Sequence, residues 1–372
     1  MIVSLLIFIL IFSFLILTHE FGHFIVAKKS GVKVEEFGLG YPPRIFGKKI
    51  GETVYSVNWI PFGGFVSLYG EDPDEREEDN ERNFSSKSPL VKTGILSAGV
   101  IINFLTAVVI FYLLLALSGF QTSQSQMFDY QFPFGQQENQ AVVSQVATGS
   151  PAASAGIEGY DMVISVNDKK VSSVDQFISI IDKNKGEEIS LTLENLRSEQ
   201  TKNVEVTPRT DSPKGEGALG VGINKVAQLS YNGVEKIFSG FLHSFNMGHF
   251  TLITMGHLIE SSFVQKEIQP LSRSVAGPVG ILALTKLTVA QGFVPLLNLM
   301  GMLALALAIV NILPIPGADG GRLIFVAYEG IFRKKAPAKV EKAINLFGFY
   351  FLVFLLLLIT FKDIFQFKSV FF

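Results

Sequence analysis

Four long apolar stretches alternate with polar segments along this chain of 372 residues. The first holds no charged side chain before His19, and the others run from Thr93 to Gly119, between Lys286 and Asp319, and from Ala343 to Phe361. A hydrocarbon core of about 30 Å takes about 20 helical residues, so each stretch can cross a bilayer. The pattern therefore predicts a polytopic α-helical membrane protein with about four transmembrane helices and both termini on one side.

The distribution of charge predicts which side each loop occupies. Lysine and arginine are dense in residues 28–49 and 322–342, and the positive-inside rule assigns both loops to the cytoplasm. Residues 120–286 then lie outside. The first span is predicted to be retained, because no basic region precedes it and no small-residue cleavage site follows it. The net charge of −2 gives no indication of nucleic-acid binding.

Residues 53–69, in the first cytoplasmic loop, have the pattern of a β-hairpin. Thr53–Ile60 is rich in β-branched and aromatic residues, Phe65–Tyr69 reads as a second strand, and proline and glycine lie between them. The hairpin is either purely structural or presents an exposed edge that pairs with an extended substrate by strand addition. In the second case Gly64 and Phe65 would contact the substrate.

Residues 141–209 have the pattern of a small soluble α/β domain. The predicted elements are strands at 141–146, 162–167, 189–194 and 202–207, with helices at 150–156 and 174–183. Their order resembles a PDZ domain, most specifically in S-P-A-A-x-A-G-I followed by G-Y-D-M-V-I-S-V-N. We therefore expect an extracytoplasmic PDZ-like domain.

Two other polar segments have less specific patterns. The acidic run Glu71–Glu81 is interpreted as a solvated linker. Residues 231–263 are rich in Phe and Met but broken by charges, which favours an amphipathic helix at the outer membrane interface. The histidines of this segment, His243, His249 and His257, are not spaced by three or four residues, which favours interfacial polar side chains over a metal site.

The first apolar stretch leads into the motif H-E-x-x-H, formed by His19, Glu20 and His23. On a helix, two histidines four residues apart lie on one face. They can hold one zinc ion, while Glu20 acts as a general base toward a water molecule. Ionisable side chains at the end of a membrane helix are costly, which favours a functional role. The motif's position predicts a hydrolytic site within the bilayer.

Two histidines do not complete a catalytic zinc site, which usually has three protein ligands. The chain has no cysteine, and its other histidines are predicted outside, so a carboxylate must supply the third ligand. Asp319 follows L-P-I-P and precedes two glycines, which predicts irregular backbone near the cytoplasmic face, where the first span also ends. Such backbone is tolerated at that depth only when it is buried in protein or lines a cavity. We therefore expect Asp319 to join His19 and His23 as a zinc ligand.

The same motifs resemble those of the site-2 protease family of intramembrane zinc metalloproteases. The matching sequences are H-E-F-G-H, N-x-L-P-I-P-x-x-D-G-G, G-Y-P-P-R-I-F-G, P-F-G-G-F-V and A-G-P-V-G-I. The resemblance extends over nearly the whole chain and looks closest to the bacterial branch with a single PDZ domain. It implies that His19, His23 and Asp319 ligate zinc and that Glu20 is the base.

Two asparagines are further candidates. Asn311 matches the family's asparagine before L-P-I-P, which is implied to help hold the substrate or the developing oxyanion. Asn103 lies in A-G-V-I-I-N-F, which resembles the family's A-G-P-x-x-N-F but has Val100 in place of the proline. Either asparagine could instead form hydrogen bonds between spans.

These features predict four segments. They are the first two spans with the hairpin (1–119), the extracytoplasmic region with the PDZ-like domain (120–230), the interfacial region (231–286) and the last two spans (287–372). The expected function is hydrolysis of peptide bonds within or near transmembrane segments of other membrane proteins, with one Zn²⁺ per chain, in a bacterial inner membrane. The candidate substrates are anti-sigma factors, remnant signal peptides and other regulators, and a protease that trims them first is a candidate partner.

Two other classes of function are open to a membrane protein of this kind. A membrane-anchored PDZ scaffold with a decayed metal site is disfavoured by the intact motif residues His19, Glu20, His23 and Asp319. A metal-ion transporter would show more ionisable groups along a path and repeated halves, and the sequence shows neither. Zinc content and cleavage of a model span would separate the three.

Overall fold

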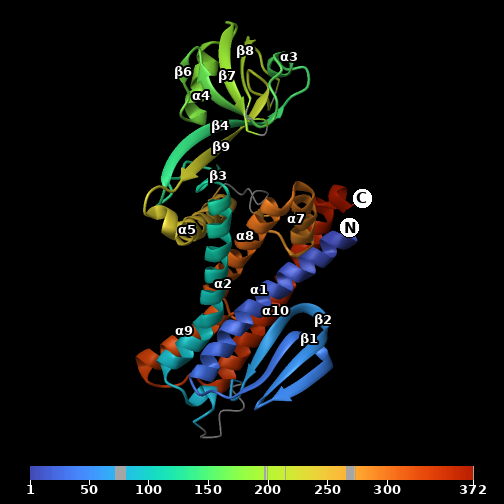
Figure 1. Cartoon of the computed structure of the whole chain (residues 1–372), viewed down its shortest axis with the longest axis vertical. Coiled ribbons are helices and arrows are strands. Elements are labelled where there is room, and N and C mark those ends of the chain that lie inside the picture. The colour runs from blue at the N-terminus through green and yellow to red at the C-terminus, as the bar shows by residue number, and fades with distance from the viewer. Residues whose placement is uncertain are drawn as a thin grey trace. The chain divides into compact units, whose positions relative to one another are not determined.

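The computed structural model describes residues 1–71, 81–196, 198, 200–213, 215–264, 272 and 274–371. They form two compact units, one of Met1–Leu114 with His243–Phe372 and the other of Leu115–Leu242 (Figure 1). The first unit contains the long helices and a small sheet, and the second is mainly β-structure. Most of the predicted acidic linker, residues 72–80, lies outside the described residues.

Four helices in the described part of the chain are long and apolar enough to cross a membrane. They are α1 (Ile2–Lys29), α2 (Pro89–Leu117), α8 (Phe293–Ile312) and α10 (Ala338–Gln366), which confirms the prediction of four apolar spans. The third predicted stretch is divided, however. A shorter helix, α7 (Pro278–Gln291), ends at Gly292, whose φ of 113° favours glycine, and α8 begins at the next residue.

Shorter helices and one long amphipathic helix complete the first unit. They are η2 (Phe84–Ser86), α9 (Asp319–Phe332), α11 (Lys368–Phe371) and α5 (Glu235–Val264), which begins in the second unit. α5 confirms that residues 231–263 are largely helical, and it is not among the four apolar spans.

The A-G-P-V-G-I segment forms the start of α7 and is held by α10. The Asp363 carboxylate accepts hydrogen bonds from the backbone N–H groups of Gly277 and Gly280, both at 2.8 Å. The first N–H groups of a helix have no partner within the helix itself. A buried carboxylate from a neighbouring helix supplies one here and ties α7 to α10.

The sheet of the first unit consists of β1 (Val34–Ile50) and β2 (Thr53–Leu68). The hairpin predicted within residues 53–69 is therefore wrong, because β2 runs through almost all of that segment and the turn lies at residues 51–52. Phe37 of β1 pairs with both Tyr55 and Val66, so the first half of β1 lies between the two halves of β2. Three glycines and two prolines in β1 break its strand pattern, which is why the sequence did not reveal it.

This register identifies the edges of the small sheet. Residues 46–50 pair with 53–57. Residues 54–57 also pair with 36–39, and residues 34–39 pair on their other side with 64–68. Gly64–Leu68 is therefore an edge segment of the described sheet. It lies beside α1, where Ser13 Oγ donates a hydrogen bond to the Pro61 carbonyl at 2.8 Å.

The second unit is built on one sheet with the strand order β3-β9-β4-β5-β7-β8, and β6 pairs with β5. The strands are β3 (Gln121–Gln126), β4 (Gln136–Val146), β5 (Asp161–Val166), β6 (Lys169–Lys170), β7 (Ile189–Asn195), β8 (Thr201–Val206) and β9 (Val221–Ser230), and the helices are α3 (Pro151–Ser154) and α4 (Val174–Lys183). The predicted strands and helices between residues 141 and 209 are all present. That range is too short for the folded unit, because β9 pairs with β4 and the buried core includes Leu219.

Candidate metal centre

The H-E-x-x-H motif lies in the last third of α1, where two of its side chains are buried. His19 and His23 are only 7% and 6% exposed, and their rings meet edge-on with centroids 4.7 Å apart. Both point from one face of α1, as the four-residue spacing predicts. Glu20 follows His19 directly on the same helical turn.

Asp319 reaches the two histidines from the other end of the sequence. Pro314 and Pro316 follow directly on α8, and the chain turns at residues 313–318 before α9 begins at Asp319. Asp319 is thus the first residue of a helix, rather than part of the irregular backbone that the sequence predicted. A side chain on Gly320 would lie 2.1 Å from the Leu313 carbonyl oxygen, so the turn requires glycine there.

The three candidate ligand atoms converge on one point. Asp319 Oδ2 lies 3.0 Å from His19 Nε2 and 3.3 Å from His23 Nε2, and the two Nε2 atoms are 3.1 Å apart. Ligands at about 2.0–2.1 Å from a tetrahedral zinc ion lie about 3.3 Å from one another. The spacing and the donor set of two imidazoles and one carboxylate both fit zinc.

The charge state of the carboxylate also suits a cation. Burial raises the pKa of Asp319, but the neighbouring His19 and His23 rings outweigh burial and hold this pKa below its usual range. Asp319 Oδ2 is buried and has no hydrogen-bond partner of good geometry. A buried carboxylate oxygen without such a partner is costly, and a metal ion would satisfy it.

The outer nitrogens of both rings are held by α2. His23 Nδ1 lies 2.8 Å from the Ile95 carbonyl oxygen, which can only accept, so Nδ1 carries the proton and Nε2 keeps its lone pair for a metal. His19 Nδ1 lies 3.4 Å from the Asn103 side-chain amide. Asn103 is fully buried and also lies 3.5 Å from Thr18 Oγ1. The structure therefore brings Asn103 to the back of His19.

Small residues let α2 approach the two imidazoles. A Cβ atom on Gly99 would lie 2.4 Å from His23 Nε2 and 2.6 Å from His19 Cε1. On the facing helix, a Cβ on Gly22 would lie 2.6 Å from the Ala98 carbonyl oxygen. No sequence pattern predicted a role for these glycines or for the Ile95 carbonyl, because each acts through tertiary contact alone.

Glu20 lies between the metal group and the edge of the small sheet. Its Oε2 accepts a hydrogen bond from the Val66 backbone N–H at 3.1 Å. A Cβ built on Gly64 would lie 3.8 Å from Glu20 Cγ, so the backbone of the edge segment runs directly past this carboxylate. An oriented carboxylate beside a metal group can act as a general base.

The remaining predicted residues lie in different surroundings. Phe65 packs over Gly38 and stacks with Tyr41 at a centroid distance of 6.3 Å. Asn311, in the last turn of α8, is partly exposed and makes no hydrogen bond to the three ligand residues within the described chain. None of the three histidines of α5 belongs to a metal-binding group among the described residues.

Known proteins resemble this chain over nearly its whole length. The model of a family described as peptidase family M50 matches residues 7–355. A relative from Clostridium perfringens, named as a candidate zinc metalloprotease, is 35% identical over 96% of this chain and 97% of its own length. Zinc metalloprotease RasP of Oceanobacillus iheyensis is 26% identical over 96% of this chain and 97% of its own length.

A solved structure resembles a smaller part of the chain. It is the PDZ domain of the SdrC-like protein from Listeria monocytogenes, which is 19% identical and covers 22% of this chain and 85% of that one, with a TM-score of 0.20. The range matched by the family model, residues 7–355, contains both histidines, Glu20 and Asp319.

Proposed function

The chain belongs to peptidase family M50, and from that premise we propose that it is an intramembrane endopeptidase that cuts within or near the transmembrane segments of other proteins. It is a zinc metalloprotease, and its family consists of membrane proteases acting on membrane proteins. The observation that carries the proposal is the convergence of His19, His23 and Asp319 beside Glu20, on a helix apolar enough to cross a membrane.

We assign each of these residues a separate task. His19, His23 and Asp319 would hold zinc, which when bound lowers the pKa of a coordinated water and polarises the scissile carbonyl. Glu20 would accept the proton of the attacking water and pass it to the leaving amine. Ile95 and Asn103 would fix the orientation of the two imidazoles, so this proposal makes Asn103 a positioning residue rather than a substrate contact.

The proposed location of the reaction follows from the distribution of charge. The metal group lies near the C-terminal end of α1, whose last turn contains Lys28 and Lys29. The positive-inside rule assigns that end to the cytoplasmic face of the bacterial inner membrane and the second unit to the outside. The second unit would then act before the reaction, as a filter for bulky substrates or as a docking site for trimmed ones.

A mapped cleavage reaction tests the proposed function. The purified full chain in liposomes should cut a single-span substrate within its apolar segment or beside it, near the cytoplasmic face, as read by mass spectrometry of the fragments. A substrate with its extracytoplasmic domain removed should be cut faster than the untrimmed one. Cuts confined to soluble segments of the substrate would contradict the intramembrane assignment, and equal rates would contradict the filter.

We further propose that Gly64–Leu68 holds the substrate. Amide bonds within a transmembrane helix are hydrogen-bonded and shielded, so the helix must unwind before water can attack. An extended segment can pair through its main chain with an exposed strand edge, largely independently of sequence. Support comes from the edge position of this segment and its approach to Glu20. The other segment considered from sequence, Val54–Asn58, is a weaker candidate because residues 54–57 have neighbours on both sides.

Proline at Val66 tests this role of the edge. The Val66 N–H points away from β1, so Val66→Pro removes an outward donor while leaving the pairing within the sheet. We expect KM for a single-span substrate to rise about tenfold, the effect of one or two hydrogen bonds, with zinc content unchanged. A change confined to kcat would report only the lost hydrogen bond to Glu20. Lys48→Pro, in the opposite edge segment, is the matched control. Normal cleavage by a folded, zinc-loaded Val66→Pro variant would make the edge purely structural.

A further inference from the structure

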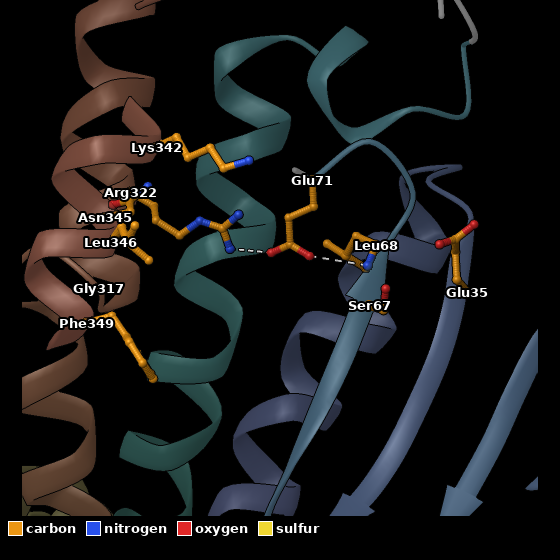
Figure 2. Close-up of a pocket in the computed structure, with 10 residues that line it drawn as sticks. All are labelled: Glu35, Ser67, Leu68, Glu71, Gly317, Arg322, Lys342, Asn345, Leu346 and Phe349. Atoms are coloured by element: carbon orange, nitrogen blue, oxygen red, sulfur yellow. Dashed lines mark hydrogen bonds and ion pairs between the residues drawn. The ribbon is translucent and has the colours of Figure 1, made fainter. Parts of the chain in front are cut away.

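A cavity of about 590 Å³ lies at the end of this edge segment (Figure 2). One wall comes from Ser67 and Leu68 of β2 and from Glu71, which follows it. The opposite wall comes from Arg322 of α9 and from Leu346 and Phe349 of α10. The volume is typical of ligand pockets in proteins. The cavity therefore continues the path of the edge beyond Val66, and both of its walls contain polar and apolar side chains.

The outward backbone groups of the edge lead into this cavity. Residues two apart in a strand direct their N–H and C=O groups to the same side, so Leu68 faces outward as Val66 does. The backbone groups of the alternate residues point toward the rest of the sheet. The Tyr69 N–H, for example, donates to the Lys33 carbonyl at 3.0 Å. An added strand that reached Val66 would thus meet Leu68 next.

Glu71 forms hydrogen bonds with both the N–H and the C=O of Leu68. Its Oε2 accepts from the Leu68 N–H at 3.3 Å, and its own N–H donates to the Leu68 carbonyl at 3.1 Å. A residue in a hydrogen-bonded antiparallel pair exchanges these same two bonds with its partner. One residue of the chain therefore takes the place of a residue in an added strand.

Arg322 holds Glu71 in that place from across the cavity. Its Nη1 forms an ion pair with Glu71 Oε1, while Oε2 faces Leu68, as Figure 2 shows. The two carboxylate oxygens thus have separate partners. Oε2 can leave the strand edge without breaking the ion pair.

We propose that Leu68 and this cavity form a main-chain subsite for the extended substrate, and that Glu71 occupies the subsite until substrate displaces it. The carbonyl of one substrate residue would accept a hydrogen bond from the Leu68 N–H, and the N–H of the same substrate residue would donate to the Leu68 carbonyl. The Glu71 carboxylate would then remain on Arg322. The inference rests on the proposed pairing of substrate with Gly64–Leu68 and adds a second site of pairing and an internal competitor.

Removing the competing carboxylate should strengthen substrate binding. In the full-length, zinc-loaded enzyme, Glu71→Ala is expected to lower KM for a single-span substrate by about two- to tenfold, because one hydrogen bond no longer has to be displaced, with kcat unchanged. Glu71→Asp, which keeps the charge but is one methylene shorter, should lower KM in the same direction. Glu52→Ala removes a carboxylate that also pairs with an arginine, Arg82, but lies outside the cavity, and it serves as the matched control, with KM unchanged.

The outcomes separate this inference from the proposed function. If Glu71→Ala loses zinc through its link to α9, the result for Glu71→Asp decides. An unchanged or higher KM in the zinc-loaded Glu71 variants would overturn the subsite, as would an equal fall in KM in Glu52→Ala. The Val66→Pro experiment reports independently on the edge itself. A loss of cleavage in Val66→Pro with no fall in KM for the Glu71 variants would leave edge pairing in place and remove only the role of Glu71.

Discussion

Glu20→Gln should abolish most proteolysis and leave zinc bound. Glutamine keeps the size of the side chain and can still accept the hydrogen bond from the Val66 N–H, which holds Glu20 at 3.1 Å. It cannot take a proton from water at neutral pH. Loss of a general base typically costs about 10²–10⁴-fold in rate, so we expect kcat to fall by that factor. The measurement is the initial rate of cleavage of a single-span substrate, with zinc quantified in the same preparation.

The control for this variant is another carboxylate near the same helix end. Glu52 lies at the β1–β2 turn, 3.8 Å from Lys28 at the end of α1, and is not part of the metal group. Glu52→Gln should cleave normally. Cleavage by Glu20→Gln within tenfold of the natural enzyme would rule out the role of Glu20 as base.

Loss of two ligands should empty the metal site. We expect about one zinc per natural chain, because the three ligands form a single group. In the double variant with His23→Ala and Asp319→Ala, one imidazole cannot retain the ion, and both zinc and proteolysis should fall to background. Elemental analysis of the purified protein gives the zinc content.

An exposed histidine provides the matched control for zinc loss. His257 on α5 has a side chain that is 56% exposed and lies outside the metal group, so His257→Ala should keep full zinc. Undiminished zinc in the His23 and Asp319 double variant would mean that the ion is held elsewhere.

The sequence was most informative where a local pattern carried the structure. Long apolar runs predicted the spans, because a bilayer imposes their length and polarity. The four-residue spacing of His19 and His23 predicted their shared face, and the chemistry of zinc required a third ligand. Asp319 could be chosen because the prolines before it end a span on the same predicted side. The structure brings these three side chains together.

The sequence was least informative about contacts between distant segments. The strand β1 was missed because its glycines and prolines obscure the alternating pattern, and β2 was consequently split into a hairpin of its own. Ile95 holds His23 through its backbone carbonyl, and no side-chain pattern in the sequence predicts such a contact. The acidic run containing Glu71 has the composition of a solvated linker, yet Glu71 joins β2 to Arg322, which is 251 residues further along the chain than Glu71.

The most direct test of the central claim is anomalous X-ray scattering at the zinc absorption edge, measured on crystals of the full chain. The account predicts one strong peak at about 2.0–2.2 Å from His19 Nε2, His23 Nε2 and a carboxylate oxygen of Asp319. A zinc peak away from these residues, or one that contacts the two histidines while Asp319 points elsewhere, would contradict it.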